Sequence, residues 1–309
     1  MEKTLDRIQT SLLEQVSGLH EMPEGAYSLR VNGQLFGKNS SAHIAIEKKT
    51  DKPGIDIYIK PGTKNESVHI PVILSETGLN DLVYNDFHVG EGCDVVIVAG
   101  CGIHNCGVQT SEHSGIHTFY VEKNARLRYI EKHYGEGDGN GKNIMNPTTI
   151  VYLAEGAYME METAQIKGVD STERKTEAVL EDRSTLIIHE KIMTHGKQFA
   201  RTSFKVELNG QDCGTHVVSR SVAKGHSHQQ FLSNVRGNNA CSGHTECDAI
   251  IMDSASVEAI PEICANHVDA SLIHEAAIGK IAGEQLIKLM TLGLTEKEAE
   301  EEIINGFLK

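Results

Sequence analysis

Thiol, imidazole and carboxylate side chains gather between Asn238 and Glu275. These residue types are the ligands that proteins offer to iron and zinc. The candidates in this segment are Cys241, Cys247, Cys264, His244, His267, His274 and Glu275. The chain contains no CxxC pair, so a structural zinc finger is not expected. The sequence instead suggests a mixed-ligand metal site whose members come from separate strands.

Strand geometry limits which of these residues can share a site. Cys241 and Cys247 are six residues apart, so on one unbroken strand they lie about 20 Å apart. The interval between Cys247 and His274 matches one period of the repeat described below. We therefore predict that these two side chains sit in register on adjacent coils. Glu275 follows His274 directly and should face the other way, unless a bulge or a second copy of the chain intervenes.

Two further observations have simple structural alternatives. His189, His216 and His244 recur at nearly equal intervals and are predicted to stack, either along a polar channel or as a solvent-facing ladder. General burial preferences favour the ladder. The alternative for Cys247 is an inert buried thiol, which is common for free cysteine, and for the adjacent His-Glu pair it is a polar surface position.

A recurring phrase organises residues 68–279. Each copy has turn residues, a small residue and then alternating apolar positions, which is a strand pattern. The interval between copies is nearly constant and falls in the range typical of stacked repeats, and stacked strands form a parallel β-helix. A β-sandwich is the alternative architecture, but it lacks such a long period. The markers of the copies are Ala125, Ala157, Ser184, Cys213, Ala240 and Ala270.

Helical periodicity is confined to the two ends of the chain. The spacing predicts one helix within residues 2–16, stopped by Gly18, followed by short strands within residues 27–71. Two short helices are predicted near the C-terminus, the second opened by the capping box TEKE and stopped by Gly306. They would either cap the stack or present a face to a partner.

We accordingly divide the chain into an N-terminal helix (1–25), a β-helix core (26–275) and a C-terminal helical segment (276–309). The glycine-rich segment 135–142 has the wrong spacing for a phosphate-binding loop and lacks its Ser or Thr. A mobile surface loop is expected there.

Composition narrows the classes of partner. Lys and Arg number 29 against 43 Asp and Glu, a formal charge of -14. Such a surface repels phosphate backbones and anionic lipids, so neither nucleic acid nor a membrane is an expected partner. An odd number of scattered cysteines without a secretion signal indicates a cytoplasmic protein.

Several phrases, in order along the chain, resemble the SufB/SufD family, the scaffold proteins of the SUF iron–sulfur cluster assembly system. They are VAGC, KNARLRY, EGAYME, TECDAIIM, SLIHEAAIGKI and LTEKEAEEEIINGF, and they cover roughly residues 95–307. The resemblance implies a right-handed parallel β-helix with helical ends. It also implies a SufC-like ABC ATPase docked on the C-terminal helices, and pairing of two chains through the β-helix. A homodimer is therefore expected.

The resemblance also assigns residues. Cys247 falls on the cluster-building cysteine of B-type members, and Glu275 on their essential glutamate. His274 falls on the important histidine of D-type members. Cys101 falls on the B-type cysteine proposed to receive sulfur and pass it through the β-helix. Because B-type and D-type features occur together, the chain resembles a single-gene form whose two copies supply what two proteins supply elsewhere.

The chain also departs from the family pattern. It is shorter than common bacterial members and is expected to lack their long N-terminal domain, which argues against a flavin. Cys106 and Cys241 match no family role.

The function implied is that of a scaffold, not an enzyme, which holds a transient iron–sulfur cluster between a sulfur donor and recipient apoproteins. ATP energy would come from the partner. Two alternatives remain at this point: a cluster-free regulatory subunit of the ATPase complex, and a β-helix polysaccharide lyase or hydrolase. The missing export signal and the cysteines on the repeats disfavour the enzyme.

Overall fold

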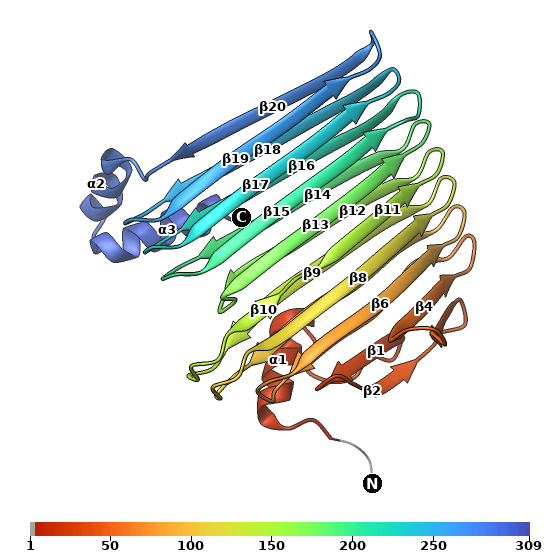
Figure 1. Ribbon diagram of the computed structural model, residues 1–309, viewed down its shortest axis with the longest axis horizontal. Helices are drawn as coiled ribbons and strands as arrows, with labels where there is room; N and C mark the ends of the chain where they lie inside the picture. The colour runs from red at the N-terminus through yellow and green to blue at the C-terminus, as the bar shows by residue number, and fades with distance from the viewer. Residues whose placement is uncertain (1–3) are drawn as a thin grey trace.

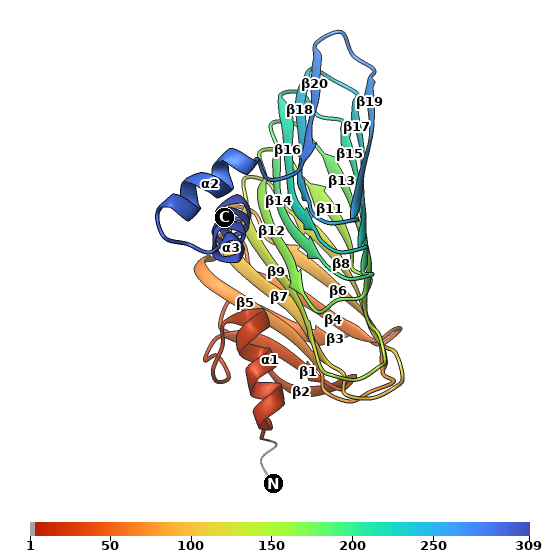
Figure 2. The ribbon, with the colours of Figure 1, turned by 90° about the vertical axis from the view of Figure 1, so that its left-hand side faces the viewer.

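The chain winds into a β-solenoid of about eight turns in the computed structural model, which describes residues 4–309 (Figures 1 and 2). Two sheets run along the solenoid. Strands from successive turns pair in parallel, except for the antiparallel pairs β1–β2 and β3–β4 at the N-terminal end. This architecture confirms the predicted parallel β-helix and excludes the sandwich, which is built from antiparallel sheets.

We call the two sheets A and B. Sheet A consists, in spatial order, of β2 (Gln34–Asn39), β1 (Ala26–Val31), β5 (Lys64–Leu74), β7 (Asp94–His104), β9 (Arg126–Glu136), β12 (Tyr158–Lys167), β14 (Thr185–Thr194), β16 (Cys213–Ala223), β18 (Cys241–Ile251) and β20 (Ala270–Gly279). Sheet B consists of β19 (Ser256–Ala265), β17 (His228–Gly237), β15 (Phe199–Leu208), β13 (Ser171–Leu180), β10 (Asn143–Met145), β8 (Ser111–Val121), β6 (Asn80–Val89), β4 (Gly54–Ile59) and β3 (Ile44–Lys48), with β11 (Thr148–Leu153) between β13 and β8.

The repeated phrase marks the turn that leads into each strand of sheet A. Ala125, Ala157 and Ser184 are buried immediately before β9, β12 and β14, where a small side chain fits inside the turn. The residue that corresponds to Cys213 on the next coil is Cys241, because the two pair in register. The predicted marker Ala240 is therefore one residue too early. The predicted period is therefore the length of one coil.

Inward residues of both sheets fill the interior of the coil. Buried and more exposed positions alternate along most strands, as expected when successive side chains face opposite sides. Most inward side chains are apolar and form one continuous core, where rings stack between neighbouring strands: Phe87 and Phe119 lie 4.4 Å apart, centroid to centroid. A minority of inward positions carry polar or charged groups, and some of these belong to the candidate site.

Helix α1 (Arg7–Ser17) confirms the helix predicted at the N-terminus and ends at Gly18, which adopts a left-handed conformation. The helix lies against the outer face of sheet A (Figure 2). Close approach is possible because β7 carries glycine at the contact: a Cβ on Gly102 would lie 3.1 Å from the Cβ of Leu12. Larger residues there would push the helix away from the sheet.

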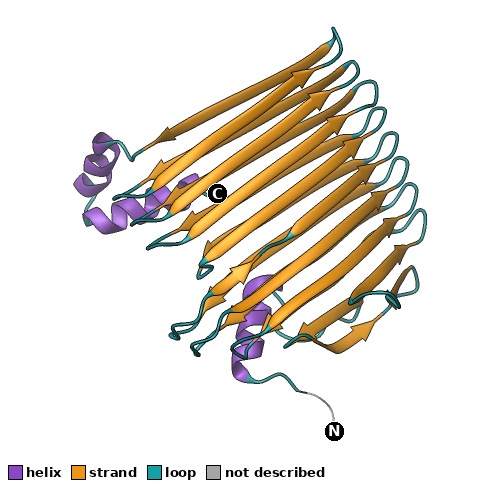
Figure 3. Cartoon of the chain, in the orientation of Figure 1, coloured by secondary structure: helices purple, strands orange, loops and turns teal. Residues whose placement is uncertain are grey.

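The C-terminal helices α2 (Gly283–Thr291) and α3 (Glu296–Phe307) also lie on the outer side of sheet A, as Figure 2 shows; Figure 3 draws these helices in purple. The predicted capping box at Thr295 is confirmed, but Gly306 does not stop α3, which continues through Phe307. Ile304 and Leu308 pack against Val222 of β16. The helices therefore rest on the flank of the solenoid.

The last coil has no cover among the described residues. Inward positions of β19 and β20 are only partly buried, and β20 and β19 are the edge strands of their sheets. Within residues 4–309, no helix has both the length and the apolar character required to cross a lipid bilayer.

Candidate functional site

Sheet A places the predicted site residues on two different faces. Cys247 on β18 points into the coil and is 1% exposed, and His274 on β20 points the same way. Glu275, the next residue, points to the outer face, where its side chain is 66% exposed. The predicted separation of His274 from Glu275 is thus confirmed, and within one chain Cys247 shares a face with the histidine.

The predicted register of the two inward ligands is wrong by two residues. Cys247 pairs with Ala276, and His274 pairs with Thr245. One strand spacing across and two residues along the strand place the α-carbons of Cys247 and His274 about 8 Å apart. They are diagonal neighbours on adjacent coils, still on the same face.

His274 has one ring nitrogen engaged and one free. Nδ1 lies 2.7 Å from the Thr245 hydroxyl, and the ring stacks beside Phe231 with centroids 6.4 Å apart. Nε2 is buried and, among the described residues, has no hydrogen-bond partner. Burial lowers the pKa of His274, with a smaller effect from His244, so the imidazole is neutral near pH 7. A neutral imidazole with an unused nitrogen is a suitable metal ligand.

Cys247 is held as a neutral thiol. Burial, followed by the charges of Glu190 and Asp248, raises its pKa to about 12. The thiol borders a cavity of about 10 Å³, roughly the space of one water molecule, which Ser219 and Phe231 also line. Because only a thiolate ligates metal, binding at Cys247 must release a proton.

A row of polar residues leads through the interior of sheet A to Cys247. Its members face one another on successive strands, and we call them the inner polar row: Glu131, Thr163, Glu190, Ser219 and Cys247. Ser219 donates a hydrogen bond of 2.8 Å to Glu190. The repeat pattern did not reveal this row, because its members stand on five separate strands and are brought together only by the register between coils.

Arg174, on sheet B, bridges the two carboxylates of the inner polar row. It pairs directly with Glu131, and its Nε lies 3.6 Å from Glu190. Burial opposes the charge on both carboxylates. Arg174 and His133 nevertheless hold the pKa of Glu131 below its usual range, whereas burial dominates at Glu190 and raises its pKa. Sequence reasoning missed this network, since its members come from strands far apart along the chain.

Cys101 lies in the same interior but far from Cys247. It pairs with His133 on β9, two positions along from Glu131 of the inner polar row. Five strand spacings separate β7 from β18, so the two cysteines are roughly 24 Å apart. Cys101 is 1% exposed, and burial, with the charges of Asp81 and Glu131, raises its pKa well above the ordinary value. The structure does not bring the two thiols together.

Glu275 joins a cluster on the outer face instead. Its carboxylate lies 3.5 Å from His244 Nε2, and it pairs in register with Glu246. The Glu246 carboxylate accepts a hydrogen bond of 2.9 Å from His216, whose ring stacks on His244 with centroids 5.0 Å apart. One ligand atom from each of His216, His244 and Glu246 lies within 4.8 Å of the others. We call these three residues the outer trio.

The predicted three-histidine stack is half correct. His216 and His244 are in register, but His189 pairs with Val218 and is displaced by two residues. Glu246 was missed as a ligand, although its position two residues after His244 on a strand already places both on one face. Two imidazoles and one carboxylate are the ligand set typical of zinc and of non-haem ferrous iron.

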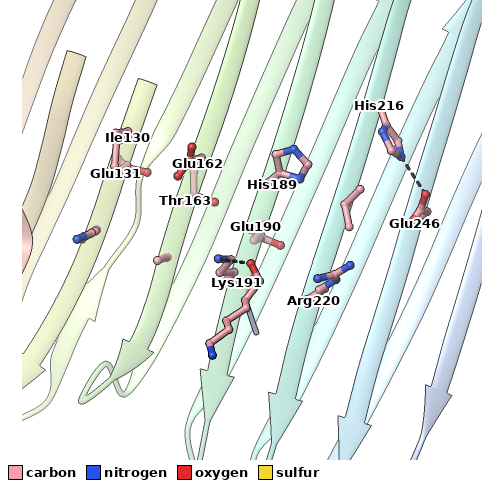
Figure 4. Close-up of a pocket in the computed structure, with 14 residues that line it drawn as sticks. Ile130, Glu131, Glu162, Thr163, His189, Glu190, Lys191, His216, Arg220 and Glu246 are labelled. Carbon is pink, nitrogen blue, oxygen red and sulfur yellow. Dashed lines mark hydrogen bonds and ion pairs between the residues drawn. The ribbon is translucent and has the colours of Figure 1, made fainter. Parts of the chain in front are cut away.

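His216 and Glu246 of the outer trio border a groove of about 560 Å³ on sheet A. Figure 4 shows His216 and Glu246 on neighbouring strands at one end of the groove, with His189, Lys191 and Arg220 further along it. Lys191 donates a hydrogen bond to the backbone carbonyl of Lys309, which also lines the groove. The groove is accessible from solvent, in contrast to the interior around Cys247.

Comparison with known proteins shows to which protein family this chain is related. The family model for "SUF system FeS cluster assembly, SufBD core domain" matches residues 82–307. The chain belongs to the SufBD family. A SufBD family protein of Archaeoglobus fulgidus is 29% identical over 280 residues, covering 89% of this chain and 73% of the relative. A relative in Methanocaldococcus jannaschii is 26% identical over 308 residues, 96% of both chains.

A mycobacterial SufBD relative matches over a smaller share of its own length. The protein of Mycobacterium tuberculosis strain H37Rv is 26% identical over 228 residues, which is 71% of this chain and 26% of the relative. The segment matched by the SufBD family model includes Cys101, Cys247, His274 and Glu275. The SufBD family takes part in iron–sulfur cluster assembly, so the resemblance seen in the sequence is confirmed at that level.

We predict that the outer trio of this SufBD chain binds one divalent transition metal. In an anaerobic titration with Co²⁺, His244→Gln and Glu246→Gln should each weaken binding more than about tenfold, because each removes one of three ligands. His189→Gln, a histidine on the same face but out of register, should bind like the parent chain. A thiolate-to-cobalt charge-transfer band, or equal binding by all variants, would contradict this assignment.

We predict that two buried histidines of the SufBD fold make stability depend on pH. Burial lowers the pKa of His117 to about 4 and of His133 to about 3, against 6.5 in an unfolded chain. Below pH 6.5 the unfolded state therefore binds protons that the folded state excludes, and stability falls. Each histidine should lower the free energy of unfolding by about 2 kcal/mol between pH 7 and pH 5. Urea unfolding at the two pH values measures the loss.

His117→Gln should reduce that loss by about 2 kcal/mol, because one of the two titrating groups is removed. His20→Gln, at an exposed position on the N-terminal side, should leave the loss unchanged. The comparison uses only the difference between the two pH values, so a lower absolute stability of the variant does not affect it. An identical loss in all three proteins would show that the buried rings are not responsible.

Proposed function

We propose that this SufBD chain is a cytoplasmic scaffold on which an iron–sulfur cluster is assembled and from which it is transferred to recipient apoproteins. Cys247 provides a thiolate ligand, while His274 and Glu275 provide weaker ones. The observation that supports this most directly is the shared inward face of Cys247 and His274, with the histidine Nε2 free of any partner among the described residues. A set with one thiolate per chain holds a cluster less firmly than four thiolates, which suits a scaffold that must release it.

The C-terminal end of the coil is the proposed site of pairing with a second copy. β20 and β19 have unpaired edges there, and exposed edges are templates for strand addition. Apolar side chains are exposed on the same two strands: Ile260, Ile263, Ile273 and Ile278. Because Glu275 faces away from Cys247 in its own chain, we propose that the homodimer brings the carboxylate of one copy toward the ligands of the other.

A SufC-like ABC ATPase is the proposed energy-supplying partner, docked on residues 276–309. Helix α3 is anchored to the sheet through Ile304 and Leu308, whereas α2 has no buried residue. The apolar side chains that α2 and its end expose are Ile287, Met290 and Leu292. An anchored helix beside an exposed apolar one has the character of a docking surface.

Cys101 is the proposed relay for sulfur between a donor and Cys247. The inner polar row supports a route through the interior, since it provides polar side chains on every strand of sheet A from β9 to β18. Direct exchange between the two thiols requires contact between the sulfur atoms, so a separation of roughly 24 Å demands a small sulfur species or an opening of the coil. The closed interior around Cys101 points to ATP-driven opening.

The second candidate function is a cluster-free regulatory subunit of the ATPase complex. The observation that favours it is the burial of Cys247 as a neutral thiol beside a cavity no larger than a water molecule. In that case the interior network would serve stability alone. Iron content after co-expression with the ATPase separates the two functions, because a regulatory subunit purifies without iron.

We predict that anaerobic reconstitution with ferrous iron and sulfide gives visible absorption that depends on Cys247. Cys247→Ser should lose most of this absorption, because a serine hydroxyl is a poor ligand in a sulfide cluster. His274→Gln should lose a smaller part. Cys213→Ser is the matched control, since Cys213 is equally buried but lies at the turn end of β16. Undiminished absorption in Cys247→Ser would reject the ligand assignment.

We predict that the ATPase contact is sensitive to one exposed side chain of α2. When the chain is co-expressed with a tagged SufC-like ATPase, Ile287→Glu should no longer co-purify, because a charge would be buried against the partner. Val268→Glu is the control, an exposed apolar position in the β19–β20 turn. Loss of co-purification in both variants, or in neither, would argue against docking through α2.

A further inference from the structure

Three side chains with catalytic potential converge at the end of β7, away from the interior. Cys106 Sγ lies 2.9 Å from His104 Nε2. The other ring nitrogen of His104, Nδ1, lies 3.0 Å from a carboxylate oxygen of Glu136. We call Cys106, His104 and Glu136 the Cys106 triad. A nucleophile in contact with a base that is in turn oriented by an acid is the arrangement of activated thiols.

Strand register and glycine together build this arrangement. His104 and Glu136 are the last residues of β7 and β9 and pair directly across the sheet. The glycine-rich segment 137–142 then folds back over the loop that carries Cys106. Gly139 N–H donates to the Asn105 carbonyl over 3.2 Å, and Gly141 N–H to the Gly107 carbonyl over 2.9 Å.

Glycine is required where these two loops touch. A Cβ on Gly139 would lie 2.3 Å from the Gly107 carbonyl oxygen, and one on Gly137 would lie 2.2 Å from that of Asn105. The segment expected to be a mobile surface loop thus packs against the loop that carries Cys106. Its glycines match no phosphate-binding pattern because their role is backbone contact.

The hydrogen bonds define the state of the histidine. Because a carboxylate can only accept a hydrogen bond, the contact with Glu136 places a ring proton of His104 on Nδ1, which leaves Nε2 to accept from the Cys106 thiol. Tyr134 holds the carboxylate from the other side through a hydrogen bond of 3.1 Å. The Asp138 carboxylate also lies within hydrogen-bond reach of the Cys106 thiol, which lowers the pKa of Asp138, so this carboxylate and His104 Nε2 compete for the single thiol proton.

Cys106 differs from the other six cysteines, all of which lie within residues 4–309. It is the exposed one; Cys264 is partly exposed, and the rest are buried. Cys264 has an amide neighbour, Asn266, at 3.2 Å, whereas Cys106 contacts a histidine. Cys101, only five residues before Cys106, is sealed inside the coil. A large sulfur donor could reach Cys106 without any change in the solenoid.

We propose that Cys106 is the nucleophile that accepts sulfur from a persulfide-bearing donor, with His104 as its base and Glu136 as a positioning residue. This inference rests on the proposed scaffold function and moves the point of sulfur entry from the interior to the surface. Cys101 then acts after entry.

The transfer conserves atoms and electrons. The Cys106 thiol gives its proton to His104 Nε2, and the thiolate attacks the terminal sulfur of the donor persulfide. A new S–S bond forms on Cys106 while the S–S bond of the donor breaks. The donor leaves as a thiolate and takes the proton from His104, so no external oxidant or reductant is needed.

The first test measures reactivity of the full chain without iron. At pH 7, iodoacetamide should alkylate Cys106 about tenfold or more faster than Cys264, because His104 Nε2 contacts the Cys106 thiol and can take its proton, whereas Cys264 contacts an amide. His104→Gln should abolish the difference. Glu136→Gln should shift the pH profile of alkylation upward while leaving urea unfolding unchanged, which a purely structural role would not produce.

The second test uses a low-molecular-weight persulfide. The parent chain should gain the mass of one sulfur atom on Cys106, whereas Cys106→Ser should gain none there; Cys264→Ser should behave like the parent. Cys106→Ser should still form a cluster from iron and free sulfide, because sulfide bypasses the entry step. Equal alkylation of Cys106 and Cys264, or sulfur uptake independent of His104, would overturn the proposal. Neither alkylation nor sulfur uptake involves the cluster, so failure of the scaffold function would be seen separately.

Discussion

The alternation of side chains along strands that stack in register is the constraint on which the rest of this structure depends. Each residue of sheet A is assigned to the interior or to the outer surface by whether its position along the strand is odd or even. Each then meets the corresponding residue of the next coil at about 4.8 Å. Functional side chains in this fold are therefore aligned in rows across successive coils, and all members of a row lie on the same face of the sheet.

Two rows of opposite accessibility follow from this constraint. The inner polar row places Glu131, Glu190 and Cys247 in a medium that disfavours charge, which raises the pKa of the thiol and makes Arg174 necessary. Breaking one buried ion pair of this kind typically costs about 3–5 kcal/mol. The outer trio lies on β16 and β18, two of the same strands, but on the outer face, where its three residues are partly exposed. A buried interior and an exposed surface on the same strands would suit a protein that binds iron and sulfur at separate places.

The helices cover only part of the outer surface of the solenoid. α1 and α3 both lie on the outer face of sheet A, at different heights along the solenoid (Figure 2). The groove with His216 and Glu246 is lined by outward residues of the same sheet. Neither covers the last coil, where β19 and β20 retain free edges. The fold thus concentrates its accessible features at three places: the flank of sheet A, the open end, and the loop of Cys106.

The amino-acid sequence by itself determined the coil and the faces. The nearly constant period of the repeated phrase required stacked strands, and the adjacency of His274 and Glu275 required that they point apart, because both follow from local backbone geometry. Only the tertiary structure decided the contacts between coils. The turns between strands differ in length. The interval between Cys247 and His274 equals one typical period, yet the two residues are two positions out of register. The interval from His104 to Glu136 is longer, yet these two residues lie directly opposite each other. Register across a solenoid depends on every intervening turn, and that information is not contained in any single interval of the sequence.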